Sequence, residues 1–188
     1  MTMRRWANLS YLDAIRPEPG WRTDYALLAS YSADLVALAG ALLALAGLDD
    51  DRGSGSKVDF ANAVDRLANR VRLVVQAGRL AAPAKAPKIL AVLARYVREV
   101  PRDEARASWH PKAVLVRQIA EDGGEARWRL WIGSRNLTRS LAWDVGLTLV
   151  GQVGGGAGRG IDGIPELGHS LAAHAALPEI SPDDARSE

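Results

Sequence analysis

A hairpin pattern between residues 110 and 133 limits the folds that this chain can adopt. Two β-rich runs, HPKAVLVRQIA (110–120) and EARWRLWIG (125–133), flank the tetrapeptide EDGG, whose glycines can adopt positive φ. A third strand-like run, DVGLTLVG (144–151), follows the polar segment SRNLTRSLAW, which reads as a loop or a short helix. The sequence therefore predicts a hairpin and a further strand, which need helices to cover them.

Helical and strand patterns precede the hairpin. Leu and Ala recur with helical spacing between Asp24 and Leu48, where Ser32 is a candidate N-cap and Gly47 a plausible end. The other expected elements are a helix over Val58–Asn69, a strand over 70–78 and a helix over Ile89–Glu99. The order strand, crossover helix, strand predicts an α/β fold, with a mixed β-sheet flanked by helices on both faces.

The length of 188 residues is that of one domain, with a core over about 24–150. Residues 151–188 read as a glycine-rich connection, a short helix over Ile164–Leu177 and an acidic end. The chain has no cysteine, which excludes disulfides, thiolate metal sites and a cysteine nucleophile. The longest apolar stretch, 35–48, is too short to span a bilayer, and the first residues lack a signal-peptide core. We expect a cytoplasmic protein with no membrane partner.

Charge is segregated along the chain. Between Lys57 and Arg139 there are 17 Lys and Arg against 8 Asp and Glu, whereas the rest of the chain has 7 basic and 14 acidic residues. A basic middle suits an anionic partner such as a phosphodiester backbone. An arginine-rich surface without a partner is the alternative.

The residues that carry chemistry lie at the two ends of the hairpin. In an extended chain His110 and Lys112 point to the same side, and hairpin pairing could bring Ser134 and Asn136 beside them. Imidazole can act as a nucleophile or carry a proton near neutral pH, while an ammonium and a carboxamide can neutralise charge on phosphate oxygens. This set suits attack on a phosphodiester. An ordinary strand start is the alternative.

The motifs HPK at 110–112 and GSRNLTRS at 133–140 resemble the signature of the phospholipase D superfamily. That signature is H-x-K, an acidic residue somewhat later, and then G-S-x-N. The motif resemblance covers 108–150, about a quarter of the chain, and the order of elements over 24–150 also suits one half-unit of that fold.

The resemblance implies a role for each matching residue. His110 corresponds to a nucleophile that forms a covalent phosphohistidine, and Lys112 and Asn136 to a phosphate-binding pair. Ser134 corresponds to a supporting hydrogen-bond donor. Related nucleases carry an acidic residue beyond G-S-x-N that hydrogen-bonds the histidine, and Asp144 is the candidate here. A cap at the start of the next strand is the alternative for Asp144.

The sequence departs from the family pattern at two places in the hairpin. Arg117 stands where the signature has its acidic residue, five positions after the lysine. Branches of the superfamily that act on DNA also lack this residue, so its loss does not exclude activity. The spacing from the lysine to G-S is longer than usual, which the hairpin extension IAEDGGEAR (119–127) explains most simply.

A third departure concerns the number of histidines. The family mechanism uses two histidines, one attacking and one protonating the leaving group, usually from two motif copies, and this chain has one copy. His169 and His174 lack a lysine two residues on and are poorly spaced for one metal ion. We therefore expect no metal and no cofactor, and a second histidine from a symmetric homodimer. A second half-unit in a longer or split enzyme is the alternative.

The sequence constrains the class of substrate less than the class of reaction. The basic residues Arg135 and Arg139, with Thr138 between them, favour a nucleic-acid backbone, and Trp109 could stack on a base although core packing is its commoner role. The sequence therefore predicts a metal-independent phosphodiesterase, a nuclease acting on DNA or RNA. The alternatives are a catalytically silent module of the same fold, for dimerisation or nucleic-acid binding, and a lipid phosphodiesterase.

Overall fold

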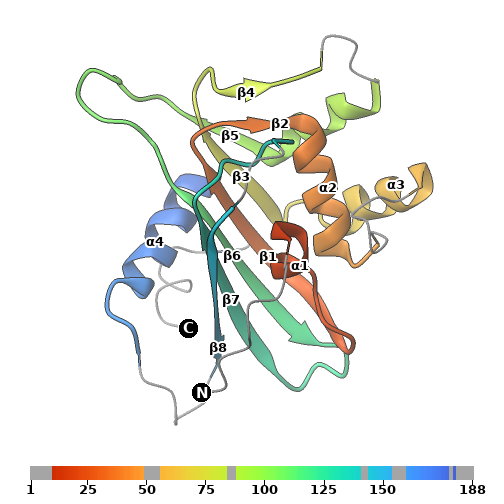
Figure 1. Ribbon diagram of the computed structural model, residues 1–188. Coiled ribbons are helices and arrows are strands. Elements are labelled where there is room, and N and C mark those ends of the chain that lie inside the picture. The colour runs from red at the N-terminus through yellow and green to blue at the C-terminus, as the bar shows by residue number, and fades with distance from the viewer. Residues whose placement is uncertain are drawn as a thin grey trace.

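The computed structural model describes residues 10–48, 56–83, 88–140, 144–153, 160–177 and 180, with the backbone only at 89 and 90. Its centre is a six-stranded sheet in the order β5-β3-β1-β6-β7-β8 (Figure 1). The strands are β1 (Trp21–Ser30), β3 (Val71–Gln76), β5 (Val97–Val100), β6 (Lys112–Ala120), β7 (Ala126–Gly133) and β8 (Gly146–Gln152). Strands β5, β3 and β1 run parallel to one another, and β1, β6, β7 and β8 alternate in direction. Two short strands, β2 (Ala33–Asp34) and β4 (Leu80–Ala81), pair separately.

Helices cover both faces of this mixed sheet. On one face lie α1 (Tyr11–Ile15), α2 (Leu35–Ala46), α3 (Lys57–Arg66) and the 3₁₀ helix η1 (Lys88–Tyr96), while α4 (Ile164–Ala175) lies on the other (Figure 1). Leu28, Leu73 and Val114 face the first group, and Leu27 and Leu115 face α4. The predicted α/β class, the mixed sheet and the helices on both faces are confirmed, and the assignment to a phospholipase D-type half-unit stays a prediction.

Strand β1 corrects the prediction of a helix starting at Asp24. Residues 26–30 are buried, with successive side chains on opposite faces, because β1 is central and covered on both sides. A strand buried on both faces reads as a continuous apolar run, which mimics a helix in sequence. Helix α2 begins only at Leu35, capped by Asp34 instead of Ser32, and it ends as predicted at Gly47, where φ is 67°.

The predicted helix over Ile89–Glu99 is also only partly correct. The segment forms η1 up to Tyr96, and Val97–Val100 then becomes β5, paired in parallel with Leu73–Gln76 of β3. Residues 97–100 pair with β3 and form the edge strand of the sheet, and this pairing overrides the helical spacing of the sequence. Only Val100 of the strand is buried. The expected loop at 49–57 lies outside the described residues except for its last two, which start α3.

The segment after residue 160 packs back onto the sheet. Helix α4 matches the predicted Ile164–Leu177 closely, and Leu171, Ala172 and Ala175 are buried against Leu27 and Val74. The glycine-rich run at 154–159 and the acidic end at 181–188 lie outside the described residues. In the part of the chain that is described, no helix has the length and apolar character needed to cross a bilayer.

Candidate functional site

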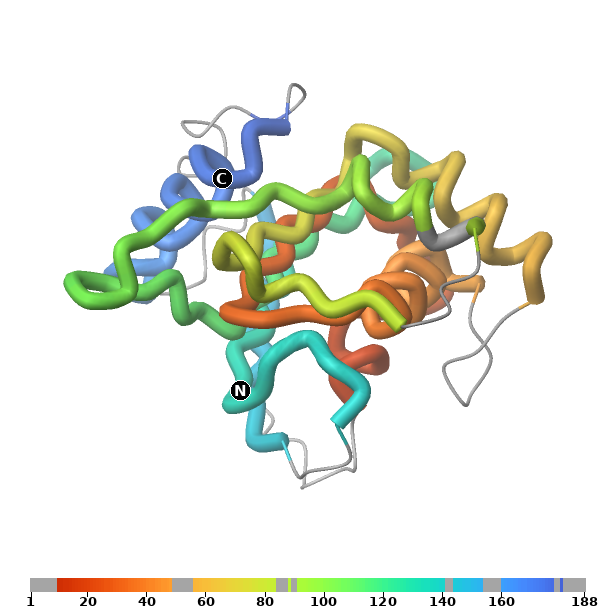
Figure 2. Tube along the Cα trace, turned by 90° about the horizontal axis from the view of Figure 1, so that it is seen from above, coloured from red at the N-terminus to blue at the C-terminus, as the bar shows by residue number. Residues whose placement is uncertain are grey.

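The termini of several strands meet at one edge of the sheet. Ser30 at the end of β1 pairs with Lys112 at the start of β6, and Ala113 next to it pairs with Ile132, one residue before the end of β7. The carboxyl ends of β1 and β3 therefore lie beside the loops that precede β6 and follow β7 (Figure 2). In open α/β sheets this is the edge at which ligands usually bind.

His110 and Lys112 contact each other at this edge, as the sequence predicts. Lys112 Nζ lies 2.9 Å from His110 Nδ1 and 3.5 Å from the His110 carbonyl oxygen. An ammonium can only donate, so a neutral imidazole in this arrangement presents its Nδ1 lone pair to Lys112 and carries its proton on Nε2. His110 is exposed and Lys112 half-buried, so the pair is open to a ligand.

The packing of Trp131 explains why position 133 is a glycine. A Cβ atom on Gly133 would lie 1.9 Å from Trp131 Cη2, and one on Gly146, its partner in β8, would lie 2.6 Å from Trp131 Nε1. The indole cannot retreat easily, because it is 7% exposed and packs edge-on against Tyr11 at a centroid distance of 4.8 Å. Glycine at the head of the GSRN motif thus leaves room for the aromatic wall beneath the site.

The variant Gly133→Ala is expected to lower the free energy of unfolding by about 2 kcal/mol or more, since the new methyl group must displace a buried indole. Gly151→Ala in β8 is a matched control, because a Cβ there would meet nothing within 4 Å, and it should be neutral or slightly stabilising. Urea denaturation of both variants measures the difference. Equal effects would show that Trp131 does not fill this space.

Ser134 and Asp144 form the base of the loop after β7. The Asp144 carboxylate accepts from the Ser134 amide at 3.0 Å and from its hydroxyl at 2.8 Å, and Ser134 Oγ accepts from the Val145 amide at 3.1 Å. The predicted hydrogen bond from His110 to Asp144 is not found among the described residues. Asp144 instead fixes the start of β8, which agrees with the alternative that the sequence left open.

Asn136 is carried by a loop that is pinned to the ends of β1 and β2. The Leu137 amide donates to Ser30 Oγ at 3.0 Å, the Leu137 carbonyl accepts from the Asp34 amide at 3.0 Å, and the Arg139 amide donates to Asp34 Oδ2 at 2.9 Å. Asn136 Oδ1 is buried and has no hydrogen-bond partner within the described ranges. A buried amide oxygen without a partner costs about 1–3 kcal/mol. Oδ1 only accepts, so the Nδ2 group of Asn136 is the part of this side chain that could donate to an anion.

The predicted substrate-binding residues differ in their surroundings. Arg139 pairs with Asp34 at 3.4 Å although its side chain is 59% exposed, and Arg135 donates to the Ser140 carbonyl. The Thr138 amide donates to the Asn136 carbonyl at 2.8 Å, which tightens the loop. Trp109 packs on the α4 side of the core, and its indole lies 4.5 Å from the His174 ring, so one face is already occupied.

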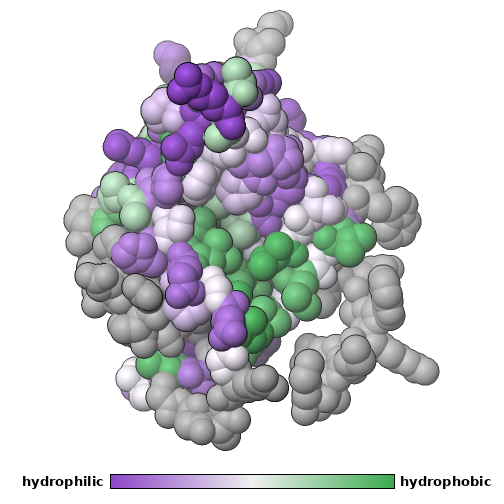
Figure 3. Space-filling view, turned by 90° about the vertical axis from the view of Figure 1, so that its left-hand side faces the viewer, coloured by the Kyte–Doolittle hydropathy of each residue, from purple (hydrophilic) through white to green (hydrophobic). Residues whose placement is uncertain are grey.

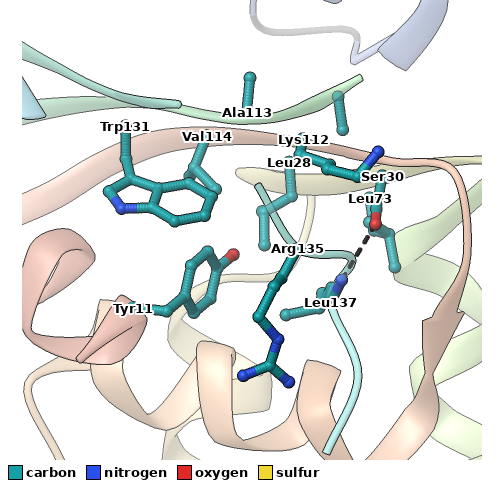
Figure 4. A pocket seen from close by; sticks show the side chains of 11 residues that line it. Tyr11, Leu28, Ser30, Leu73, Lys112, Ala113, Val114, Trp131, Arg135 and Leu137 are labelled. Carbon is teal, nitrogen blue, oxygen red and sulfur yellow. Dashed lines mark hydrogen bonds between the residues drawn. The ribbon is translucent and has the colours of Figure 1, made fainter. Parts of the chain in front are cut away.

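A small pocket opens between this loop and the sheet (Figure 4). Lys112 and Ser30 line it from the strands, Arg135 and Leu137 from the loop, and the rings of Tyr11 and Trp131 form its aromatic side, together with Leu28, Ala29, Leu73, Ala113 and Val114. Burial, followed by the nearby Asp144 charge, raises the pKa of Tyr11 far above its ordinary value, so its hydroxyl stays protonated. The pocket thus combines two cations with an apolar wall.

Sequence reasoning missed a second polar group beside His110. The Tyr31 ring lies 4.7 Å from the His110 ring, and the Tyr31 hydroxyl donates to Glu104 at 3.3 Å. Arg79 donates to both Glu104 oxygens at 2.8 Å, and this hydrogen bonding lowers the pKa of Glu104 and raises that of Arg79. Their position was the available signal, because Tyr31 directly follows the carboxyl end of β1 and Arg79 lies three residues after the carboxyl end of β3.

The other two histidines lie on α4 and do not join His110 in a metal site. His174 Nδ1 contacts the Ser170 carbonyl at 2.8 Å, and its Nε2 lies 3.3 Å from Arg102. Across the described residues, no group of three or more His, Asp or Glu side chains is arranged to hold a metal ion. Arg117, in the position of the family's acidic residue, pairs with Asp24 at 2.6 Å. It lies roughly 16 Å along β6 from Lys112, so it does not belong to the site.

Comparisons with known proteins give one distant structural likeness. No protein-family model matches the chain, and no curated protein matches it. Among solved structures, a mutant of yeast tyrosyl-DNA phosphodiesterase is similar at 17% identity with a TM-score of 0.35, over 66% of this chain and 23% of that one. The chain thus spans about a quarter of the length of that protein.

Proposed function

We propose that this protein is a metal-independent phosphodiesterase that cleaves DNA or RNA through a phosphohistidine on His110. The observation that carries the proposal is the contact of 2.9 Å between Lys112 and His110 at an open edge of the sheet. The loop bearing Asn136 is pinned to the same edge. An imidazole, an ammonium and a carboxamide are the groups that such a reaction needs.

The reaction follows from these groups. A phosphodiester oxygen draws the Lys112 ammonium away from His110, which frees an imidazole lone pair to attack phosphorus. A P–N bond forms, the P–O bond to the leaving group breaks, and the leaving oxygen takes a proton from a second histidine. Water then attacks the phosphohistidine, gives its proton to that second histidine, and the P–N bond breaks. Lys112 and Asn136 neutralise charge on the non-bridging oxygens in both steps.

The second histidine belongs in this proposal to another copy of the chain. His169 and His174 lie on α4, with His174 already in contact with Ser170 and Arg102, so neither is offered to the site. Apolar side chains are exposed at the end of the sheet beside the loop, where Ile132 pairs with Leu147 and both are at least 40% exposed. Apolar surface also gathers on the face shown in Figure 3. Light scattering is expected to give twice the mass of one chain, and a monomer that retains activity would contradict this part.

Nucleic acid is the proposed substrate because the two loops that flank the site, before β6 and after β7, carry cations. Arg102 and Arg106 precede His110, and Arg135 and Arg139 follow β7. The side chain of Arg106 is 88% exposed and that of Arg139 is 59% exposed, so both can reach a phosphate backbone. Binding to single-stranded oligonucleotides should weaken steeply with salt. Binding to neutral lipid vesicles in place of oligonucleotides would favour a lipid phosphodiester instead.

The second candidate is a catalytically silent module of the same fold. The hydrogen bonding of Asp144 to Ser134 favours it, since His110 then lacks the expected carboxylate. Hydrolysis of bis-p-nitrophenyl phosphate in EDTA separates the two. Turnover that survives EDTA, with a p-nitrophenyl phosphoryl group on the tryptic peptide 107–112 after an alkaline quench, supports the enzyme. A dimer that binds oligonucleotides without any turnover would support the silent module.

A further inference from the structure

Tyr31, directly after β1, lies against the ring of His110. The two ring centroids are 4.7 Å apart with 42° between the planes. We propose that Tyr31 is a positioning residue that sets the orientation of the His110 imidazole, and that Glu104 holds Tyr31 in place. The catalytic part of this inference rests on the proposed function, whereas the geometric part does not.

Glu104 and Arg79 together form a charged anchor that holds Tyr31 in place. Its hydroxyl donates to Glu104 Oε1 at 3.3 Å, and the Arg79 guanidinium lies 5.1 Å from the centre of its ring. Arg79 Nε donates to Glu104 Oε1 at 3.2 Å and Arg79 Nη2 donates to Oε2 at 2.8 Å, a two-bond geometry that fixes a carboxylate firmly. Hydrogen bonding by Arg79 keeps the pKa of Glu104 below its ordinary value, so the anchor stays ionised at neutral pH.

Gln76 couples this anchor to the backbone next to His110. Its side-chain oxygen accepts from the Trp109 amide at 2.7 Å, and its side-chain nitrogen donates to Glu104. Gln76 is 2% exposed at the end of β3, so it is a rigid support. Gln76 and Glu104, which are hydrogen-bonded to each other, therefore hold both the backbone before His110 and the Tyr31 ring beside it.

The proposed reaction requires the His110 imidazole to keep one orientation during attack. His110 is exposed, and within the described part of the chain its ring contacts Lys112 and Tyr31 alone. When a phosphate draws Lys112 away, Tyr31 is the remaining contact that limits rotation of the imidazole. Correct orientation of a nucleophile is worth orders of magnitude in rate. An aromatic face also favours the positive charge that the ring carries after attack. Tyr31 acts through His110 and needs no contact with substrate.

The geometric part is tested without reference to activity. The chain has three histidines, so its ¹³Cε1–¹H spectrum has three signals, and His110→Ala assigns one of them. In the wild type the His110 signal should be displaced by the ring current of Tyr31. Tyr31→Leu should return the signal to the free-histidine position, while Tyr31→Phe should retain most of the displacement. A His110 signal that Tyr31→Leu leaves unchanged would overturn the inference, whether or not the protein is an enzyme.

The catalytic part is tested by kinetics on bis-p-nitrophenyl phosphate in EDTA. Tyr31→Leu should lower kcat about 10- to 100-fold while KM changes less than about 3-fold, because orientation is lost and phosphate binding is not. Tyr31→Phe should restore kcat to within about 3-fold of the wild type, and Glu104→Gln should fall between the two. Equal losses in Tyr31→Phe and Tyr31→Leu, or a loss confined to KM, would refute a positioning role. If the wild type shows no His110-dependent turnover, the proposed function fails, and the spectrum alone decides the orientation of His110.

Discussion

His110→Ala is expected to lower kcat on bis-p-nitrophenyl phosphate by roughly 10⁴-fold or more, which is the largest effect we anticipate. The substitution removes the group that forms the covalent intermediate in our proposal. In a symmetric dimer it also removes the group that protonates the leaving oxygen, so both steps fail together. Steady-state turnover in EDTA measures the loss.

The same variant should remain folded. His110 is exposed, and its ring contact with Tyr31 accounts for about 1 kcal/mol at most. His169→Ala on α4 serves as the histidine control and should retain activity within about 3-fold. A melting temperature close to that of the wild type, together with lost turnover, separates chemistry from folding. Turnover that survives His110→Ala would remove the nucleophile from the proposal.

Asp24→Ala is expected to lower the free energy of unfolding by about 3 kcal/mol, which is the largest effect on stability that we anticipate. The Asp24 carboxylate is 10% exposed and lies 2.7 Å from Arg70 and 2.6 Å from Arg117. Its removal leaves two guanidinium groups close together with no carboxylate between them. The cost stays at the low end for a buried pair, because the Arg70 and Arg117 side chains are 41% and 22% exposed.

Asp103→Ala is the matched control for Asp24. Asp103 pairs with Arg106 at 3.6 Å, with both side chains more than 60% exposed, so its removal should cost at most about 1 kcal/mol. Urea unfolding of both variants at low and high salt gives the comparison. The Asp24 contribution should persist in salt, since buried pairs are screened less than exposed ones. Similar small losses in the two variants would mean that Asp24 is not a structural ion pair.

The sequence was sufficient for the local part of the site. His110 and Lys112 are two residues apart at a strand start, and the EDGG turn brings the GSRN motif to the same edge. Alternation along a strand and the geometry of a short hairpin are local properties, so they can be predicted from neighbouring residues. The same holds for Gly47, whose positive φ ends α2.

The rest of the site depends on contacts that are distant in sequence. Tyr31 and Glu104 are 73 residues apart, and Gln76 and Trp109 are 33 apart. Predicting these contacts requires knowing that β1 and β3 are neighbours in the sheet. The continuous apolar run of β1 reads as a helix in the sequence, so the strand itself is not predicted. Asp144 was ambiguous for the same reason, because only the path of the loop after β7 decides which side chain its carboxylate meets.

A crystal structure with bound orthovanadate tests whether three side chains from the two ends of the hairpin bind a single tetrahedral anion. We predict vanadium bonded to a nitrogen of His110, with Lys112 Nζ and the Asn136 amide within hydrogen-bond distance of its oxygens. Vanadate bound elsewhere, or an Asn136 amide too far away to reach the ion at His110, would contradict the account.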